Sequence, residues 1–102
     1  MLIVLTTVPT QEEGESLATA LVEARLAGCV QVLPRMTSVY VWEGKTQNEG
    51  EHLLLIKTLD EKWDDLRSFI EQHHSYDVPE IVAIESEKVS GPYLSWLNSL
   101  IG

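Results

Sequence analysis

The pattern of apolar and polar positions predicts a small mixed fold built around one long β-hairpin. Leu2–Leu5 and Ile81–Ile84 are continuous apolar runs, which are typical of strands buried on both faces. Between them, residues 37–58 place β-branched and aromatic residues on either side of a turn region from Glu43 to Gly50. If the first arm begins at Cys29, it is far longer than the other predicted strands, so the hairpin must extend beyond its own sheet.

Three helices are predicted between and after these strands. Thr10 and Glu13 form a capping box at the start of the first helix, and Gly28 is placed to end it in a left-handed conformation. Asp60 is placed to cap a second helix, whose apolar residues recur every three or four positions. Pro92 lies in the first turn of a closing helix, where its missing N–H costs nothing.

The predicted order β-α-β-β-α-β followed by a helix matches an α+β, ferredoxin-like topology in a single domain, residues 1–102. Right-handed crossovers place both crossover helices on one face of the sheet. The strands nevertheless carry apolar residues on both faces, so the second face forms an apolar patch larger than a soluble monomer usually exposes. We therefore expect partner subunits to complete the fold.

The negative net charge of the chain limits the kinds of molecule that it can bind by electrostatic attraction. The net charge is −9, from 16 acidic and seven basic side chains, which argues against binding to nucleic acid or to an anionic membrane surface. Cys29 is the only cysteine, so no intrachain disulfide can form, and a free thiol favours a reducing, cytoplasmic location. No apolar run is long enough to span a membrane.

Three residues are candidate metal ligands. His73 and His74 are adjacent at the end of the second helix, where imidazole rings can serve copper or zinc. The alternative is that the helix dipole favours these rings at a C-terminus, with His73 continuing the apolar stripe. Cys29 is either a small buried apolar residue, or a metal ligand or reactive thiol at the end of the sheet.

A second group of residues is a candidate ligand cleft. Tyr40 and Trp42 on the hairpin and Tyr76 in the loop after the second helix either line this cleft or pack a subunit interface. Lys57 is a lone cation near the end of an apolar strand and needs an anionic partner. The candidates are Glu49, Glu51, Asp77 and Glu80. The pairing is either a structural ion pair or a substrate anchor.

The stretches that carry a family resemblance are Thr6, Thr7 and Pro9; Leu21–Glu23; Leu26, Ala27, Cys29 and Val30; Ser38, Tyr40, Trp42, Gly44 and Lys45; Ile56–Thr58; His74, Tyr76 and Val78–Ile81; and Tyr93 and Trp96. Taken together they resemble the CutA family of divalent-cation tolerance proteins over essentially the whole chain. The resemblance implies a ferredoxin-like homotrimer whose long hairpins reach across to neighbouring subunits. It also implies binding of divalent metal, with copper held by the paired histidines and by a cysteine in the first strand, where this chain has Thr6.

The sequence therefore predicts a trimeric protein that binds Cu(II) or another divalent ion and contributes to divalent-cation tolerance. The alternative is a small-ligand sensor like the trimeric PII signalling proteins, which are similar in fold but need basic residues for phosphates. An RNA-recognition domain shares the element order but is opposed by the negative charge. No residue spacing assigns a reaction, so we expect a binding protein and not an enzyme.

Overall fold

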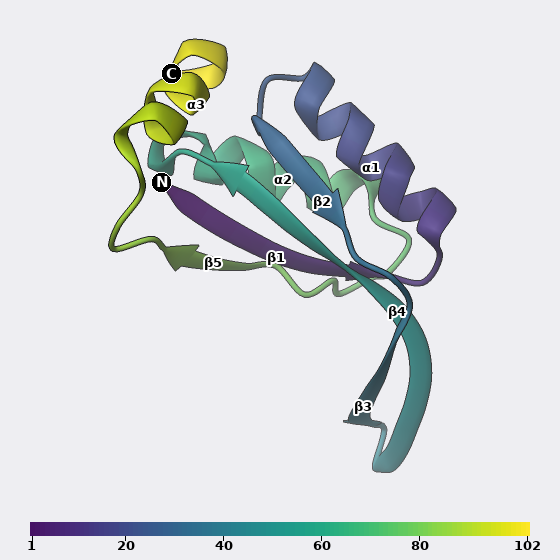
Figure 1. The fold of residues 1–102 in the computed structure, drawn as a ribbon. Helices are drawn as coiled ribbons and strands as arrows, with labels where there is room; N and C mark the ends of the chain where they lie inside the picture. Colours follow the sequence, from purple (N-terminus) through teal and green to yellow (C-terminus); the bar gives the residue numbers. More distant parts are fainter.

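The computed structural model describes residues 1–102 as one five-stranded sheet with helices on one side (Figure 1). Along the chain the elements are β1 (Leu2–Val8), α1 (Gln11–Glu23), β2 (Cys29–Val32), β3 (Met36–Trp42), β4 (Lys45–Thr58), a 3₁₀ turn (Asp60–Lys62), α2 (Trp63–His73), β5 (Val82–Glu85) and α3 (Gly91–Ile101). The sheet order β2-β4-β1-β5, with every pair antiparallel, confirms the ferredoxin-like topology.

The core lies between this sheet and the helices α1 and α2. Side chains alternate along β4, so that Leu54, Ile56 and Thr58 are fully buried beneath the helices. Leu21 of α1 and Leu66 of α2 are fully buried in the same layer. Helix α3 packs separately at the end of the sheet near the N-terminus, where Leu97 and Ile101 cover Leu59 (Figure 1).

The other face of the sheet has no helix over it, as the two-faced strands predicted. It consists of the alternate residues of the same strands, with register pairs such as Leu5 opposite Leu55. On β5, Val82 and Ile84 remain close to half exposed. We call this surface the open face, defined by Ile3, Leu5, Leu53, Leu55, Val82 and Ile84.

The hairpin projects well beyond the sheet and sets the long dimension of the molecule, whose extents are 45 × 25 × 23 Å (Figure 1). The predicted turn region from Glu43 to Gly50 is wrong, because β4 begins at Lys45 and the turn contains only Glu43 and Gly44. Both residues have positive φ, 51° and 77°, which is the conformation of a type I′ turn and follows the right-handed twist of the strands.

The outgoing arm is not one continuous strand from Cys29. It divides into β2 and β3 around Pro34, which lacks the N–H that a sheet ladder requires. Both pieces pair with the single 14-residue strand β4, so β4 alone spans the sheet and the projecting hairpin. His52 is buried at this break, and its Nδ1 lies 2.9 Å from the Leu33 carbonyl oxygen.

The prediction that Gly28 ends α1 is also wrong. The helix ends at Glu23, and Arg25 takes the left-handed conformation, with φ 61°. Gly28 instead allows α3 to approach the sheet, since a Cβ atom there would lie 2.3 Å from Leu97 Cδ1. The capping box at Thr10 is only half formed: its hydroxyl accepts from the Glu13 N–H at 3.1 Å, while the Glu13 side chain turns elsewhere.

Candidate functional site

A cavity of about 820 Å³ lies where the hairpin leaves the sheet. The hairpin forms one wall, Thr7 at the end of β1 contributes to the floor, and the loop after α2 forms the opposite wall. Three aromatic side chains, Tyr40, Trp42 and Tyr76, and four carboxylates, Glu49, Glu51, Asp77 and Glu80, line it, whereas no lysine, arginine or histidine does. The structure therefore brings together every predicted cleft residue except Lys57: Tyr40, Trp42, Glu49, Glu51, Tyr76, Asp77 and Glu80.

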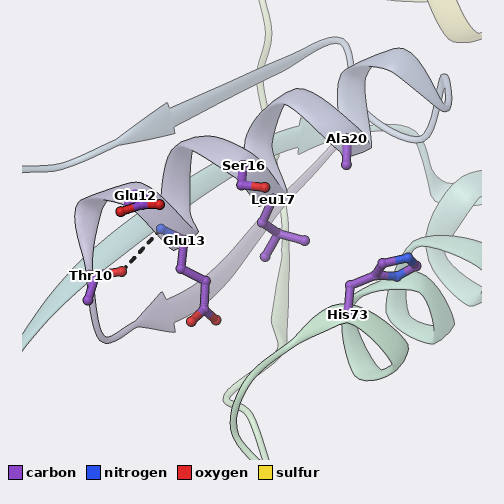
Figure 2. Close-up of a pocket in the computed structure, with 7 residues that line it drawn as sticks. All are labelled: Thr10, Glu12, Glu13, Ser16, Leu17, Ala20 and His73. Atoms are coloured by element: carbon purple, nitrogen blue, oxygen red, sulfur yellow. Dashed lines mark hydrogen bonds between the residues drawn. The ribbon is translucent and has the colours of Figure 1, made fainter.

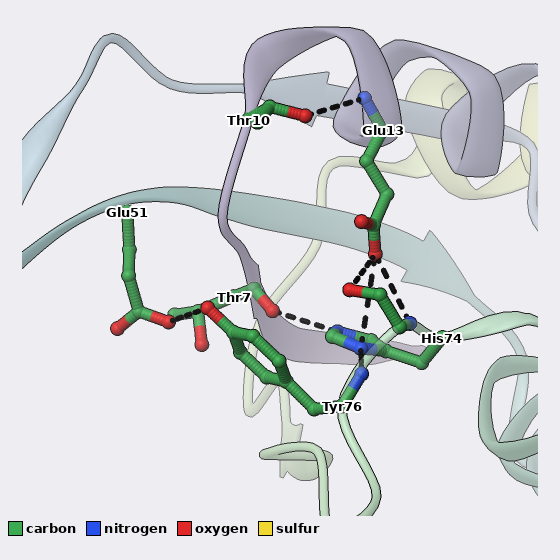
Figure 3. A network of polar contacts seen from close by, with 7 residues as sticks. Thr7, Thr10, Glu13, Glu51, His74 and Tyr76 are labelled. Carbon is green, nitrogen blue, oxygen red and sulfur yellow. Dashed lines mark hydrogen bonds and ion pairs between the residues drawn. The ribbon is translucent and has the colours of Figure 1, made fainter.

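Glu51 and Tyr76 join the two walls of this cavity. The Tyr76 hydroxyl donates a hydrogen bond of 2.8 Å to Glu51 Oε2 (Figure 3). Glu51 is only 8% exposed, although it is a carboxylate, because β4 directs it inward at the base of the hairpin. Burial and then the bond to Glu51 raise the pKa of Tyr76 well above its usual range, so the phenol remains a donor.

Tyr76→Phe should lower the free energy of unfolding by about 1–2 kcal/mol near neutral pH, because the variant leaves Glu51 without its donor. The raised pKa of Tyr76 stabilises the fold below pH 10, the ordinary value, and this stabilisation is lost as the pH rises further. The difference between the two proteins should therefore shrink above pH 10. Urea unfolding from pH 8 to about pH 11 measures it, and a constant difference would contradict the assignment.

His74 lies at the centre of a polar network behind this wall (Figure 3). Its side chain is fully buried, and its Nε2 lies 2.7 Å from the Thr7 carbonyl oxygen of β1. Its Nδ1 accepts from the Tyr76 N–H at 3.0 Å, so the ring is neutral and Nε2 carries the proton that bonds Thr7. Both ring nitrogens are thus engaged, and His74 anchors the cavity loop to the sheet.

Glu13 completes the anchor from α1. Its Oε2 accepts from the Ser75 hydroxyl at 2.9 Å and lies 3.8 Å from His74 Nδ1. The sequence pattern assigned Glu13 to the capping box at Thr10, because an acid in the first turn of a helix gives no local sign of a partner 62 residues away. Tyr40, Glu49 and Glu80, which the sequence pattern offered for the cleft, also line the cavity.

His73 faces another direction, although it is adjacent to His74. Its Nδ1 lies 2.8 Å from the Phe69 carbonyl oxygen, and its ring stacks on Phe69 with centroids 4.0 Å apart. It lies on the rim of a shallow groove of about 360 Å³ between α1 and the end of α2, which Glu12 and Glu13 also line (Figure 2). The helix ends at His73, and the extended conformation of His74 turns the two rings apart.

Cys29 does not share a site with the histidines in this chain. It pairs with Lys57 at one end of the sheet, while His74 bonds Thr7, whose register partner is Leu53. Leu53 and Lys57 are four residues apart on β4, so these two positions of the sheet are separated by roughly 13 Å at about 3.3 Å per residue. Thr6, in the strand where the resemblance places a cysteine, is fully buried and its hydroxyl has no partner. No three His, Cys, Asp or Glu side chains converge as metal ligands.

The placement of Lys57 in the cleft is wrong. Its ammonium group donates to the Gln31 side-chain carbonyl on the neighbouring strand β2, not to an acid beside Tyr76. Lys57 lies six residues from Glu51 along β4, which is roughly 20 Å at about 3.3 Å per residue. The apolar residues around Lys57 indicate that its charge needs a partner. They do not show at which end of the sheet that partner lies.

The fold and the cavity define a class: a ferredoxin-like α+β protein with a projecting hairpin and an acidic, aromatic-lined cavity at its base. The sequence profile described as "CutA1 divalent ion tolerance protein" matches residues 2–100, and the chain belongs to this family. This confirms the resemblance seen in the sequence.

Individual proteins similar to this chain also carry the family name. The divalent-cation tolerance protein CutA of Thermus thermophilus is 42% identical over 98% of this chain and 97% of its own length. A chloroplastic CutA protein of Arabidopsis thaliana is 42% identical over 96% of this chain, which spans about half (54%) of that relative. The solved Thermus structure superposes with a TM-score of 0.95 over 100% of both chains, and a rice CutA1 structure with 0.96 at 40% identity, over 99% of this chain and 93% of that one.

Proposed function

We propose that this chain is a homotrimeric protein that binds divalent metal, Cu(II) in particular, and thereby contributes to divalent-cation tolerance. Membership of a family described by divalent ion tolerance supports the general role. The net charge of −9 raises the local concentration of cations around the protein. The observation that carries the copper proposal is the environment of His73.

His73 has the arrangement typical of a metal-ligating histidine. With the Nδ1 proton donated to the Phe69 carbonyl, the lone pair lies on Nε2, and such a bond commonly orients a ligating imidazole. Imidazole suits Cu(II), which stands at the top of the divalent affinity order. Because no three ligands converge within one chain, the remaining positions belong to water, to a carboxylate such as Glu13, or to a neighbouring subunit.

Calorimetric titration of Cu(II) into the wild type and into His73→Ala tests this proposal. We expect the variant to bind at least about tenfold more weakly, because it loses the only imidazole nitrogen free to ligate in this region. Cys29→Ser is the control and should bind as the wild type does. Equal affinity in wild type and His73→Ala would contradict the proposal, while a loss confined to Cys29→Ser would move the site to the thiol.

The trimer is supported by the open face and by the hairpin. Val39 and Val41 on the hairpin are 65% and 68% exposed in the single chain, and Val82 and Ile84 of the open face are close to half exposed. Soluble monomers rarely expose large apolar patches. Closed symmetric assembly buries both surfaces at once and places the base of each hairpin at a subunit boundary.

A second candidate function is a small-ligand sensor that uses the cavity at the base of the hairpin. Its volume, about 820 Å³, lies within the range of small-molecule sites, and its mixed apolar and polar lining is typical of them. The absence of basic side chains from the lining disfavours the phosphate ligands that a PII-like sensor would need.

The proposal describes a binding protein in the cytoplasm. No helix of the structure is both long and apolar enough to cross a membrane. The single free cysteine favours a reducing compartment, whereas the similar CutA structure from Archaeoglobus fulgidus, at 33% identity, is described as periplasmic. Fractionation of the source cells decides between the two compartments.

A further inference from the structure

The cavity at the base of the hairpin lacks positive charge. Of its four carboxylates, Glu51 is buried, and no donor within the chain reaches its second oxygen, Oε1. None of the ion pairs in the structure involves any of the four. A buried carboxylate ordinarily has a charged partner or a bound cation. Glu51 has neither within this chain.

The nearest arginine on the hairpin does not fill this role. The Arg35 guanidinium lies against the backbone of Gly50, within 2.4 Å of the position a Cβ atom would take. Because side chains alternate along a strand, that position faces away from Glu49 and Glu51. Arg35 is therefore on the opposite side of β4 from the cavity.

The lining also indicates the kind of cation. A bare metal ion requires ligands converging within about 2–2.6 Å, and no such group of three exists in this chain. The cavity is instead wide and carries three aromatic rings, Tyr40, Trp42 and Tyr76. Aromatic faces attract ammonium groups and pack against aliphatic chains.

We propose that this cavity binds a short aliphatic polyamine, with its ammonium groups on Glu51 and the neighbouring carboxylates and its methylene chain against the aromatic rings. Glu49 and Glu51 lie two residues apart on one face of β4, roughly 6.6 Å at about 3.3 Å per residue, which a three- or four-carbon chain between ammonium groups can span. Asp77 and Glu80 on the opposite wall accept the remaining charge. This inference rests on the second candidate function, a ligand in the cavity.

The test is calorimetric titration of spermidine into the full-length protein and into Glu51→Gln. The substitution keeps the shape of the side chain and an oxygen for Tyr76 but removes the charge. We expect spermidine to bind the variant at least about tenfold more weakly, and butylamine, with one charge, to bind the wild type more weakly than spermidine. Glu23→Gln, an exposed acid on α1, changes the net charge equally and should leave binding unchanged.

Thermal unfolding of the unliganded proteins adds a second readout. Glu51→Gln should raise the melting temperature of the free protein, because it removes a largely buried charge that no cation of this chain balances. A lower melting temperature with loss of assembly would overturn the proposal, since a cation from a neighbouring subunit would then pair with Glu51.

Four binding results would also overturn it. If Glu23→Gln weakens spermidine as much as Glu51→Gln does, the binding is only to the net charge. If Mg²⁺ binds the cavity in preference to spermidine, the ligand is a hydrated metal ion. If ADP binds and spermidine does not, the ligand class is wrong while the sensor function stands; if neither binds, both fail, and the copper proposal at His73 is unaffected.

Discussion

Replacing His74 by alanine is expected to lower the free energy of unfolding by about 2–4 kcal/mol. The ring is fully buried, so its removal leaves a cavity between β1 and the loop after α2. It also leaves the Thr7 carbonyl and the Tyr76 N–H without their partners. A buried polar group that loses its partner keeps the full cost of its desolvation, which is why the effect exceeds that of one hydrogen bond.

The adjacent histidine supplies the control. His73→Ala removes an exposed ring whose only bond is to the carbonyl of its own helix, and it should cost less than about 1 kcal/mol. Chemical denaturation of both variants at the same protein concentration measures the contrast, because assembly makes stability depend on concentration. Equal losses for the two variants would show that His74 does not anchor the loop.

Leu55→Asp is expected to dissociate the proposed trimer. Leu55 lies in the middle of the open face, opposite Leu5 in the register of β1 and β4. A carboxylate there would be buried without a partner if the open face packs against another subunit. Sedimentation at micromolar concentration should therefore change from about three times the 11.5 kDa of one chain to a single chain.

Val22→Asp is the matched control for assembly. Val22 is an apolar residue of similar size, 37% exposed on α1 and outside the open face, so the same charge there should leave a trimer intact. Circular dichroism must show that the Leu55→Asp chain retains its helices, so that dissociation is distinguished from unfolding. A wild type that sediments as a folded monomer, or a Leu55→Asp variant that remains trimeric, would contradict the proposed interface.

The sequence pattern suggested one group of metal ligands and one group of cleft residues, and in the structure neither group stays together completely. Among the candidate ligands, only His73 keeps a ring nitrogen free, since His74 is an anchor and Cys29 lies at the other end of the sheet. Among the cleft residues, only Lys57 is absent from the cavity. The anchor at His74 holds the same loop that carries Tyr76 and Asp77, so the loop can form a defined cavity wall.

The topology and most of the helices and strands could be predicted from the sequence alone, although the ends of several were not. Strand β1 and helices α2 and α3 follow from local periodicity and from Pro92, because hydrogen bonding within a helix and alternation along a strand depend only on near neighbours. The two-faced apolar strands also predicted the open face, since the alternation of side chains does not depend on what covers them. The long hairpin was predicted for the same reason.

The role of each residue that the sequence analysis singled out depends on contacts that form only in the folded chain. Gly28 is needed for close packing against Leu97, 69 positions later, rather than for the end of a helix, and Glu13 bonds Ser75 rather than its own cap. Lys57 has its partner on β2 because the register of β4 carries it away from Glu51. Partners distant in sequence meet only when strands pair and helices pack, so local pattern identifies the residues that need a partner but not the partner.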